Sequence, residues 1–582
     1  MRFQKGPIYA ADMNGVAVDF FSQLLDEMLF DYTMDTYKPA AFSPGLMCEE
    51  LFNIVDRVER GEMDRARITP VLEELAYLIG NDGVSKGLID FEAKFYCEFS
   101  EQTKISELIS RLRLLRNRLA ARPYLLECER LILDYLKDGR DRRKLRLVVR
   151  SWAAAKINSG THPGFIRDAV HQRFFDNPED FTSLDAVKEF FESVRPAKKQ
   201  HEIYFWASPL FLHVRDQCRS FRIEVVESKD FPVAVVMPDG DRLVLLKAFG
   251  LEAKDQYTAR DIAERRIEQI SDFFVLFHHR EKLAWKKDAF VITEGQLRPI
   301  RPTQSPLKKT NDLRPPKASK RFAELVEGLS LRDPDAWSKF MSIVRLHGVA
   351  AGAESTQIQL VNLWTALEVI APHSKSKLRG VVGSIMPFLV CSYIEHIFWD
   401  LASDLRRWNG RDFRKIIAEP EYPEGYRLCH KLAEVMICEG RASTREKILI
   451  LTDGYPLLKF RCLSVIERFG SKSKITSAIE LHSKRIEWQI ERIYRARNMI
   501  VHDGGAPLAL DVLTENAHYY LDSFINVVMK LASRGGVARD IDEAITYMKE
   551  RVLLWNRYLK GQGEIGIGEV DCVISALTLG RK

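Results

Sequence analysis

The sequence has no long apolar segment. A membrane-spanning helix needs a run of about 18 to 20 mostly apolar residues, and no such run occurs in the 582 residues. The opening residues, MRFQKGPIYAADMNG, also lack the apolar core of a secretory signal. We therefore expect a cytoplasmic protein that is neither exported nor bound to a membrane.

Closely spaced metal ligands are missing as well. His278 and His279 would point to different sides of a helix, and no cysteine or paired carboxylate lies near them in the sequence. The nine cysteines are far apart, without the C-x-x-C unit that zinc and redox sites use: Cys48, Cys97, Cys128, Cys218, Cys391, Cys429, Cys438, Cys462 and Cys572. The sequence therefore predicts reduced core thiols, no metal site and no cofactor.

Net charge is too small to indicate a polyanionic partner for the chain as a whole. Lys and Arg number 87 against 81 Asp and Glu, which gives a formal net charge of +6. One stretch differs from this average. Between Arg111 and Arg150 there are thirteen basic and five acidic residues, a local excess of eight positive charges. Any anion-binding surface is therefore expected to be local.

The spacing of apolar residues divides the first half of the chain. From about Val16 to Phe191 they recur every three to four positions, which is the helical period. Between Tyr204 and Ile300 the segments FRIEVV, VAVV and RLVLL predict strands, and the last two flank a turn at Pro238-Asp239-Gly240-Asp241. A helix from Thr258 to about Glu281 and the strand AFVIT follow. The pattern indicates a small α+β module in the middle of the chain.

A proline-rich segment comes next, with few apolar residues and a composition that favours extended backbone. Beyond Phe322 the helical period returns and continues to about Lys560. The sequence thus predicts a mainly α, multidomain protein. Its expected parts are a helical N-terminal region (1–201), an α+β module (202–300), a proline-rich linker (301–320), a helical domain (321–535) and a C-terminal helical extension (536–582).

One predicted helix carries an arginine on its apolar stripe. It begins near Ser473 and ends at Asp503-Gly504-Gly505, where glycine provides a left-handed stop. At about 100° per residue, five isoleucines share an arc of about 60°, and Arg497 continues that arc. A guanidinium there is costly unless a carboxylate or phosphate meets it. The simpler alternative is an arginine that reaches past the core edge into water. The isoleucines are Ile475, Ile479, Ile486, Ile490 and Ile493.

A histidine lies at the end of the same helix. His502 is close to the negative end of the helix dipole, which favours the charged imidazolium and hence a proton donor. An acid–base group beside a fixed cation is sufficient for RNA cleavage, because the 2′-hydroxyl of RNA is itself the nucleophile. The histidine would move a proton while Arg497 stabilises charge on the phosphoryl oxygens. This chemistry requires no metal.

Arg497-Asn498, three intervening residues and then His502 resemble the Arg-polar-x-His signature of HEPN-superfamily ribonucleases, over roughly Arg321 to Gly535. The resemblance implies that Arg497 and His502 are catalytic and that Asn498 helps to position them. It also implies a homodimer whose two copies form one composite cleft. The expected function is that of a metal-independent endoribonuclease, a hydrolase of prokaryotic antiviral defence or a toxin. RNA would be its substrate and a regulatory protein or antitoxin a further partner.

The spacing within this motif raises a geometric question. Five residues apart on an ideal helix means side chains about 140° apart, so one phosphate can meet both Arg497 and His502 only if the helix loosens or a second subunit contributes. Glu368 borders the apolar face of TQIQLVNLWTALEVIAP and is a candidate to orient Arg497; the alternative is a solvated carboxylate. Asp503 is expected in a cap or loop, or near His502 to tune it.

RNA capture is expected from part of the basic stretch, here called the basic cluster: Arg140, Arg142, Arg143 and Lys144. The alternative for these residues is an ordinary solvated helix face. Two other interpretations of the whole chain stay open. The helical domain would be a catalytically inactive HEPN-type module that binds a nucleotide or a partner, or the protein would be a structural scaffold in which the motif is accidental.

Overall fold

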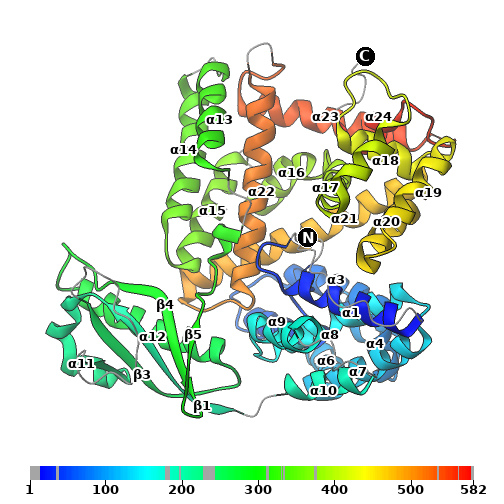
Figure 1. Ribbon diagram of the computed structural model, residues 1–582. Helices are drawn as coiled ribbons and strands as arrows, with labels where there is room; N and C mark the ends of the chain where they lie inside the picture. Colours follow the sequence, from blue (N-terminus) through cyan, green and yellow to red (C-terminus); the bar gives the residue numbers. More distant parts are fainter. Residues whose placement is uncertain are drawn as a thin grey trace.

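The computed structural model describes residues 13–33, 38–176, 184–195, 198–226, 243–309, 313–329, 331, 334–371, 376–533, 536–561 and 563–577. Within these ranges the fold is mainly helical, with twenty-four α-helices and one five-stranded antiparallel sheet near the middle of the chain (Figure 1). The predicted mainly α fold class and the strands in its middle region are confirmed.

Helices of the N-terminal region bury the apolar positions that recur every three to four residues. Phe20, Phe21 and Trp152 are among the fully buried side chains of their shared core. A 3₁₀ turn (Arg65–Arg67) and a π turn (Gln172–Asp176) interrupt the series. The helices are α1 (Met13–Leu29), α2 (Pro44–Glu59), α3 (Ile68–Asn81), α4 (Gly83–Leu88), α5 (Ala93–Cys97), α6 (Ile105–Arg118), α7 (Ala121–Asp138), α8 (Arg142–Asn158), α9 (Pro163–His171) and α10 (Asp185–Ser193).

The sheet is antiparallel throughout, with the strand order β2-β3-β1-β4-β5. Ile203 and Phe205 of β1 belong to one buried cluster with Ala263 and Ile267 of α12, whereas Tyr204 faces the other side. The elements are β1 (Lys199–Ala207), β2 (Ile223–Val226), β3 (Val244–Ala253), β4 (Trp285–Thr293), β5 (Gln296–Ile300), a 3₁₀ turn (Pro209–Val214), α11 (Arg215–Ser220) and α12 (Gln256–Val275).

The predicted strands and helix of this module agree with the structure only in part. The strand AFVIT lies in β4, and the predicted helix from Thr258 is α12, which ends at Val275 rather than near Glu281. The hairpin expected around Pro238 falls outside the described residues, apart from its last positions, which begin β3 at Val244. Sequence periodicity located the elements better than their ends.

The proline-rich segment 301–320 is not extended throughout. Pro306–Lys309 form a 3₁₀ turn, and Leu307 in that turn is buried in the helical core. α13 (Pro315–Gly328) begins inside the segment predicted as a linker. Proline is well suited to the first turn of a helix, because the N–H group that it lacks would have no partner there. The pair Pro315-Pro316 therefore starts a helix instead of preventing one.

The remaining helices form the upper part of the molecule in Figure 1. They are α14 (Pro334–Gly352), α15 (Thr356–Ile370), α16 (Lys377–Val390), α17 (Tyr393–Ala418), α18 (Leu428–Ile437), α19 (Ala442–Leu451), α20 (Pro456–Phe469), α21 (Lys472–Asn498), α22 (Leu510–Leu531), α23 (Ile541–Leu559) and α24 (Val570–Ile574). A 3₁₀ turn (Glu439–Arg441) precedes α19. Among the described residues no single helix is long and apolar enough to cross a membrane; α16 and α17 meet that test only as a pair bent by 43°.

The N-terminal helices pack directly on α20 and α21, which lie above them in Figure 1. Arg492 of α21 is only 5% exposed and binds two carboxylates: its Nη2 lies 2.9 Å from Glu50 of α2 and 2.6 Å from Glu74 of α3. Arg495 also binds Glu50, at 2.9 Å. The apolar side chains of both regions belong to one continuous core. These four charged residues, here called the docking cluster, join α21 to the N-terminal helices α2 and α3.

The ion pairs of the docking cluster favour the charged form of Glu50. Burial by itself raises the pKa of Glu50, but the charges and hydrogen bonds of Arg492 and Arg495 outweigh burial and lower that pKa from 4.5 to about 2. The folded-state pKa thus lies below the unfolded value. The resulting stabilisation is present above about pH 4.5 and is lost as the pH falls towards 2.

We predict that Glu50→Gln lowers the free energy of unfolding by about 3–5 kcal/mol, because it leaves buried guanidinium groups without their charged partner. Urea unfolding at neutral pH measures this loss. The difference between wild type and variant should shrink as the pH is lowered from about 5 to 2, where Glu50 itself becomes protonated.

Glu73→Gln is the matched control, since Glu73 pairs with Lys484 at the surface, where the two side chains are 48% and 46% exposed. Such a pair contributes about 0–1 kcal/mol. Equal destabilisation by the two substitutions would contradict the role assigned to the docking cluster.

Candidate active site

α21 carries the predicted apolar stripe. Ser471 caps its start by accepting a hydrogen bond from the backbone N–H of Lys474, at 3.3 Å. All five isoleucines of the stripe are buried. Arg497 follows them and keeps 22% of its side chain exposed. The stripe therefore ends in a guanidinium at the edge of the core, as its periodicity predicts.

Two polar side chains lie against that guanidinium. Its Nη1 donates a hydrogen bond to Oδ1 of Asn498 at 3.0 Å, and its Nη2 lies 3.9 Å from Oε2 of Glu368. The buried Nε of Arg497 has no hydrogen-bond partner within the described part of the chain. Because a guanidinium has five N–H donors in a planar fork, this arrangement retains donors that an anionic ligand can use.

Glu368 reaches Arg497 because α15 packs along α21. The ring of Trp364 on α15 lies 5.4 Å from the ring of Tyr494 on α21. Glu368 follows Trp364 by one helical turn, and Arg497 follows Tyr494 by nearly one turn, so both pairs belong to the same face of each helix. The aromatic contact thus sets the position of the carboxylate. The candidate role of Glu368, to orient Arg497, is compatible with this geometry.

The helix widens directly after Asn498. Met499–Asp503 form a π turn, in which N–H groups bond to carbonyls five residues back instead of four. Gly504 follows with φ at +61°, a left-handed conformation that glycine adopts without strain, and its N–H donates to the carbonyl of Met499. The predicted glycine stop is confirmed. The π turn also changes the ideal-helix angle of about 140° between residues 497 and 502, because it brings residues five apart closer to the same side.

His502 lies on this π turn and is exposed. Its neighbour Asp503, expected in a cap or loop, pairs with Arg57 of α2, with Oδ2 of Asp503 2.7 Å from Nη1 of Arg57. The end of α21 is therefore attached to the N-terminal region. The same helix end offers an oriented cation at its core edge and an imidazole open to solvent, which are the groups that phosphoryl transfer to an internal hydroxyl requires.

The basic cluster lies at the start of α8. Asp141 caps this helix by accepting from the backbone N–H of Lys144 at 2.9 Å. Arg140, Arg143 and Lys144 are exposed, whereas Arg142 is half-buried, and burial lowers its pKa. Cations in the first turn of a helix oppose the helix dipole, so a phosphate would be bound favourably at this position.

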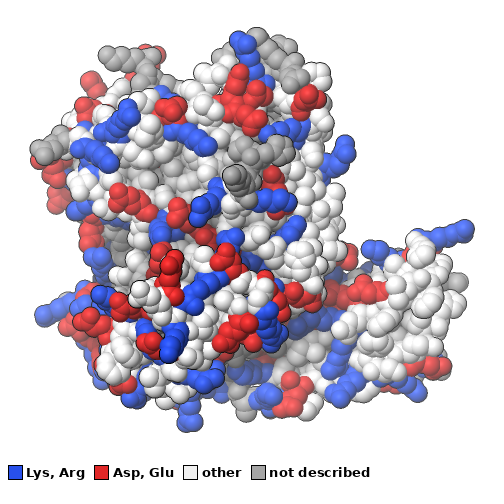
Figure 2. Space-filling view, turned by 180° about the vertical axis from the view of Figure 1, so that it is seen from behind, with Lys and Arg blue, Asp and Glu red and all other residues white. Residues whose placement is uncertain are grey.

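Much of the surrounding positive charge is already balanced. Arg143 lies 2.7 Å from Glu467 of α20, and Lys144 lies 3.1 Å from Asp141. Other arginines of the basic stretch pair with acidic residues, some of them outside it; these arginines are Arg111, Arg116, Arg118 and Arg130. On the face shown in Figure 2, Lys and Arg are interspersed with Asp and Glu. The local excess counted from the sequence therefore overstates the free positive charge.

Sequence patterns did not predict the partners that reach α21 from the N-terminal region. Arg57 and Glu50 are charged residues on the amphipathic helix α2, and Glu50 is separated from Arg492 by 442 positions. No spacing rule connects residues so far apart. The cysteines do match their prediction as thiols: all nine are free, and seven of them are buried.

Comparisons of the chain with models of protein families, with curated proteins and with solved structures gave no match. The resemblance to HEPN ribonucleases accordingly rests on the sequence motif Arg497-Asn498-x-x-x-His502.

We predict that exchanging the four residues of the basic cluster for Glu weakens RNA binding and flattens its salt dependence. Each lost phosphate contact should lower the slope of log affinity against log salt by about 0.7 for a single strand. Titrations of a labelled single-stranded RNA at several salt concentrations measure the slope.

A triple exchange to Glu at the exposed residues Arg411, Arg414 and Lys415 of α17 serves as the control. This variant changes net charge by a similar amount at another surface, and its slope should stay close to that of the wild type. A slope that is unchanged in the basic-cluster variant would assign those residues to ordinary solvated surface.

Proposed function

We propose that the protein is a metal-independent endoribonuclease of the HEPN type, with its reacting groups in the helical domain 321–535. The observation that carries the proposal is the end of α21. There a half-buried Arg497 lies between Asn498 and Glu368, one turn before an exposed His502 on a π turn. The guanidinium fork suits two phosphoryl oxygens, and the imidazole is accessible to a substrate from solvent.

The proposed reaction needs only RNA and these side chains. The 2′-oxygen attacks the adjacent phosphorus, and the bond from phosphorus to the 5′-oxygen breaks, which leaves a 2′,3′-cyclic phosphate and a 5′-hydroxyl. A base takes the proton of the 2′-hydroxyl, and an acid gives a proton to the departing 5′-oxygen. Arg497 stabilises the charge that develops on the phosphoryl oxygens.

The need for both a base and an acid in this reaction favours a homodimer. One His502 acts either as base or as acid within a single step, and a second copy of the chain supplies the other role. We propose that the helical domain forms this dimer, as the similarity to HEPN enzymes implies. The same similarity suggests a cytoplasmic enzyme of prokaryotic defence or a toxin, controlled by a regulatory partner or antitoxin.

An inactive module that binds a nucleotide or a partner is the second candidate function. The ion pair of Arg497 with Glu368 would serve such a module equally well, since it presents a cation to any phosphate. The exposed His502 supports the ribonuclease over the binding module, because binding alone does not require a titrating group at this position.

We predict that His502→Ala abolishes RNA cleavage with little effect on folding, because an exposed side chain in the last turn carries little packing. Arg497→Lys should also lose most activity, since an ammonium lacks the fork that meets two oxygens. The readout is the rate at which labelled RNA acquires 2′,3′-cyclic phosphate ends. His279→Ala, at an exposed histidine beyond α12, is the control and should cleave like the wild type.

Equal cleavage by wild type and His502→Ala would refute the catalytic assignment. If the wild type binds RNA but never cleaves it, and His502→Ala binds RNA with the same affinity, the binding module would be favoured instead.

We also expect cleavage to persist in excess EDTA, because the nucleophile is the 2′-hydroxyl and the proposed reacting groups are side chains. Initial rates with EDTA and with magnesium should agree at a temperature well below unfolding. A metal-dependent nuclease, assayed in parallel, shows that chelation is complete. Loss of activity that magnesium restores would place the chemistry at another site.

A further inference from the structure

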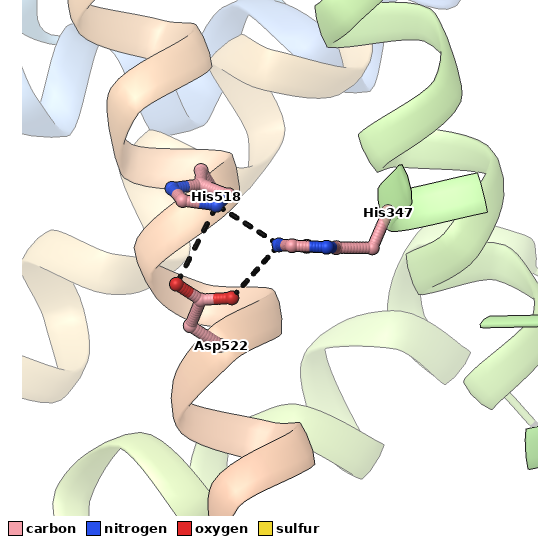
Figure 3. A group of neighbouring side chains, drawn as sticks. All are labelled: His347, His518 and Asp522. Atoms are coloured by element: carbon pink, nitrogen blue, oxygen red, sulfur yellow. Dashed lines mark hydrogen bonds and ion pairs between the residues drawn. The ribbon is translucent and has the colours of Figure 1, made fainter. Parts of the chain in front are cut away.

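Three potential metal ligands converge between α14 and α22. Nε2 of His347, on α14, lies 3.0 Å from Nε2 of His518 and 3.1 Å from Oδ1 of Asp522, both on α22. Nε2 of His518 lies 3.5 Å from Oδ2 of Asp522. Figure 3 shows the two imidazole rings and the carboxylate directed at one another across the gap between the helices. We call these residues the histidine cluster.

The helical framework explains this convergence. His518 and Asp522 are four residues apart on α22 and therefore lie one above the other on the same face. His347 approaches from α14, with its ring nearly parallel to that of His518 at a centroid distance of 5.0 Å. Two sequence-distant helices thus contribute nitrogen and oxygen ligands to one point.

Hydrogen bonding alone accounts poorly for the close approach of all three side chains of the histidine cluster. A neutral imidazole carries one proton, on one of its two nitrogens, and a proton on one Nε2 can be shared mainly with one neighbour. Two Nε2 atoms 3.0 Å apart, each also facing a carboxylate oxygen, place three electron-pair donors around one position. A divalent cation at that position would bind all three at once.

The separations suit a transition-metal ion. Ligands about 2.0–2.1 Å from zinc at tetrahedral angles lie about 3.3 Å apart. The three distances between the ligand atoms of the histidine cluster, 3.0, 3.1 and 3.5 Å, fall on either side of this value. Imidazole and carboxylate are both ordinary zinc ligands. Side-chain exposure of 29% at His347 and 37% at Asp522 gives an ion access from solvent.

From this geometry we propose that His347, His518 and Asp522 form a zinc-binding site that joins α14 to α22. Three protein ligands fill three positions of a tetrahedral ion, and water fills the fourth. The sequence predicted no metal site, because these three ligands are not all close together along the chain. The proposal is independent of the ribonuclease activity, and no reacting group of that activity belongs to the cluster.

A second group of ligand-type residues does not share these properties. Glu395, Cys429 and His430 lie together and are buried, but Arg427 already forms an ion pair with Glu395, and its Nη2 lies 3.2 Å from Nε2 of His430. Burial and the charge of Arg427 lower the pKa of His430 to about 4. A metal ion there would face a guanidinium, so the histidine cluster is the favoured site.

The test measures zinc binding by the full-length chain without a polyhistidine tag. After treatment with EDTA and its removal, the wild type should bind one equivalent of Zn²⁺ by isothermal titration calorimetry and give the visible spectrum of tetrahedral Co²⁺. Asp522→Asn and His347→Gln should each weaken zinc binding at least on the order of 10–100-fold, the loss typical of removing even an outer-shell partner. At one zinc concentration, zinc should raise the midpoint of thermal unfolding of the wild type by more than it raises that of the variants.

His279→Gln, a histidine outside the cluster, is the matched control and should bind zinc like the wild type. A wild type that binds zinc no more tightly than Asp522→Asn would overturn the proposal and leave the cluster as a hydrogen-bonded histidine pair. The wild-type cobalt spectrum decides the matter even if a variant fails to fold. Cleavage assays are read separately, so failure of the ribonuclease proposal leaves this result unaffected.

Discussion

The burial of Arg492 constrains how the two halves of the chain meet. A guanidinium removed from water has to be matched by negative charge, because an unpaired buried charge costs several kcal/mol. Glu50 and Glu74 supply that charge from two different N-terminal helices, and Arg495 shares Glu50. Apolar surfaces alone would allow several relative positions of the packed helices. The charged contacts form only in the relative position that brings all four residues together.

This constraint extends to the candidate active site because α21 is a single helix of 27 residues. Arg492 and Arg495 hold its last turns against α2 and α3, and Asp503, the last residue of the π turn, binds Arg57 of α2. The π turn between them is thus fixed at both ends. A widened helical turn is costly in isolation and persists where its surroundings determine it. The N-terminal region therefore helps to shape the end of α21 without carrying the motif.

Local patterns predicted the parts of this structure that depend on local physics. The isoleucine stripe, the arginine that continues it and the glycine stop at Gly504 all follow from helical spacing and backbone freedom. Proline content misled at Pro315, because composition does not distinguish a proline that breaks a helix from one that starts it. The sequence made Glu368 a candidate to orient Arg497 beside the alternative of a solvated carboxylate; the contact of Trp364 with Tyr494, which brings Glu368 near Arg497, appears only in three dimensions.

The histidine cluster could not be predicted from the sequence, because its residues come from distant parts of the chain. His347 and His518 are 171 positions apart, and nothing in either local sequence points to the other. Their cluster connects α14 to α22, while α15 packs against both of these helices and against α21. An ion in the cluster would therefore restrain the helices that support Glu368 without touching Arg497 or His502. In such an arrangement the metal would contribute to rigidity and the side chains at the end of α21 to proton transfer, so a metal-binding protein can still carry out metal-independent chemistry.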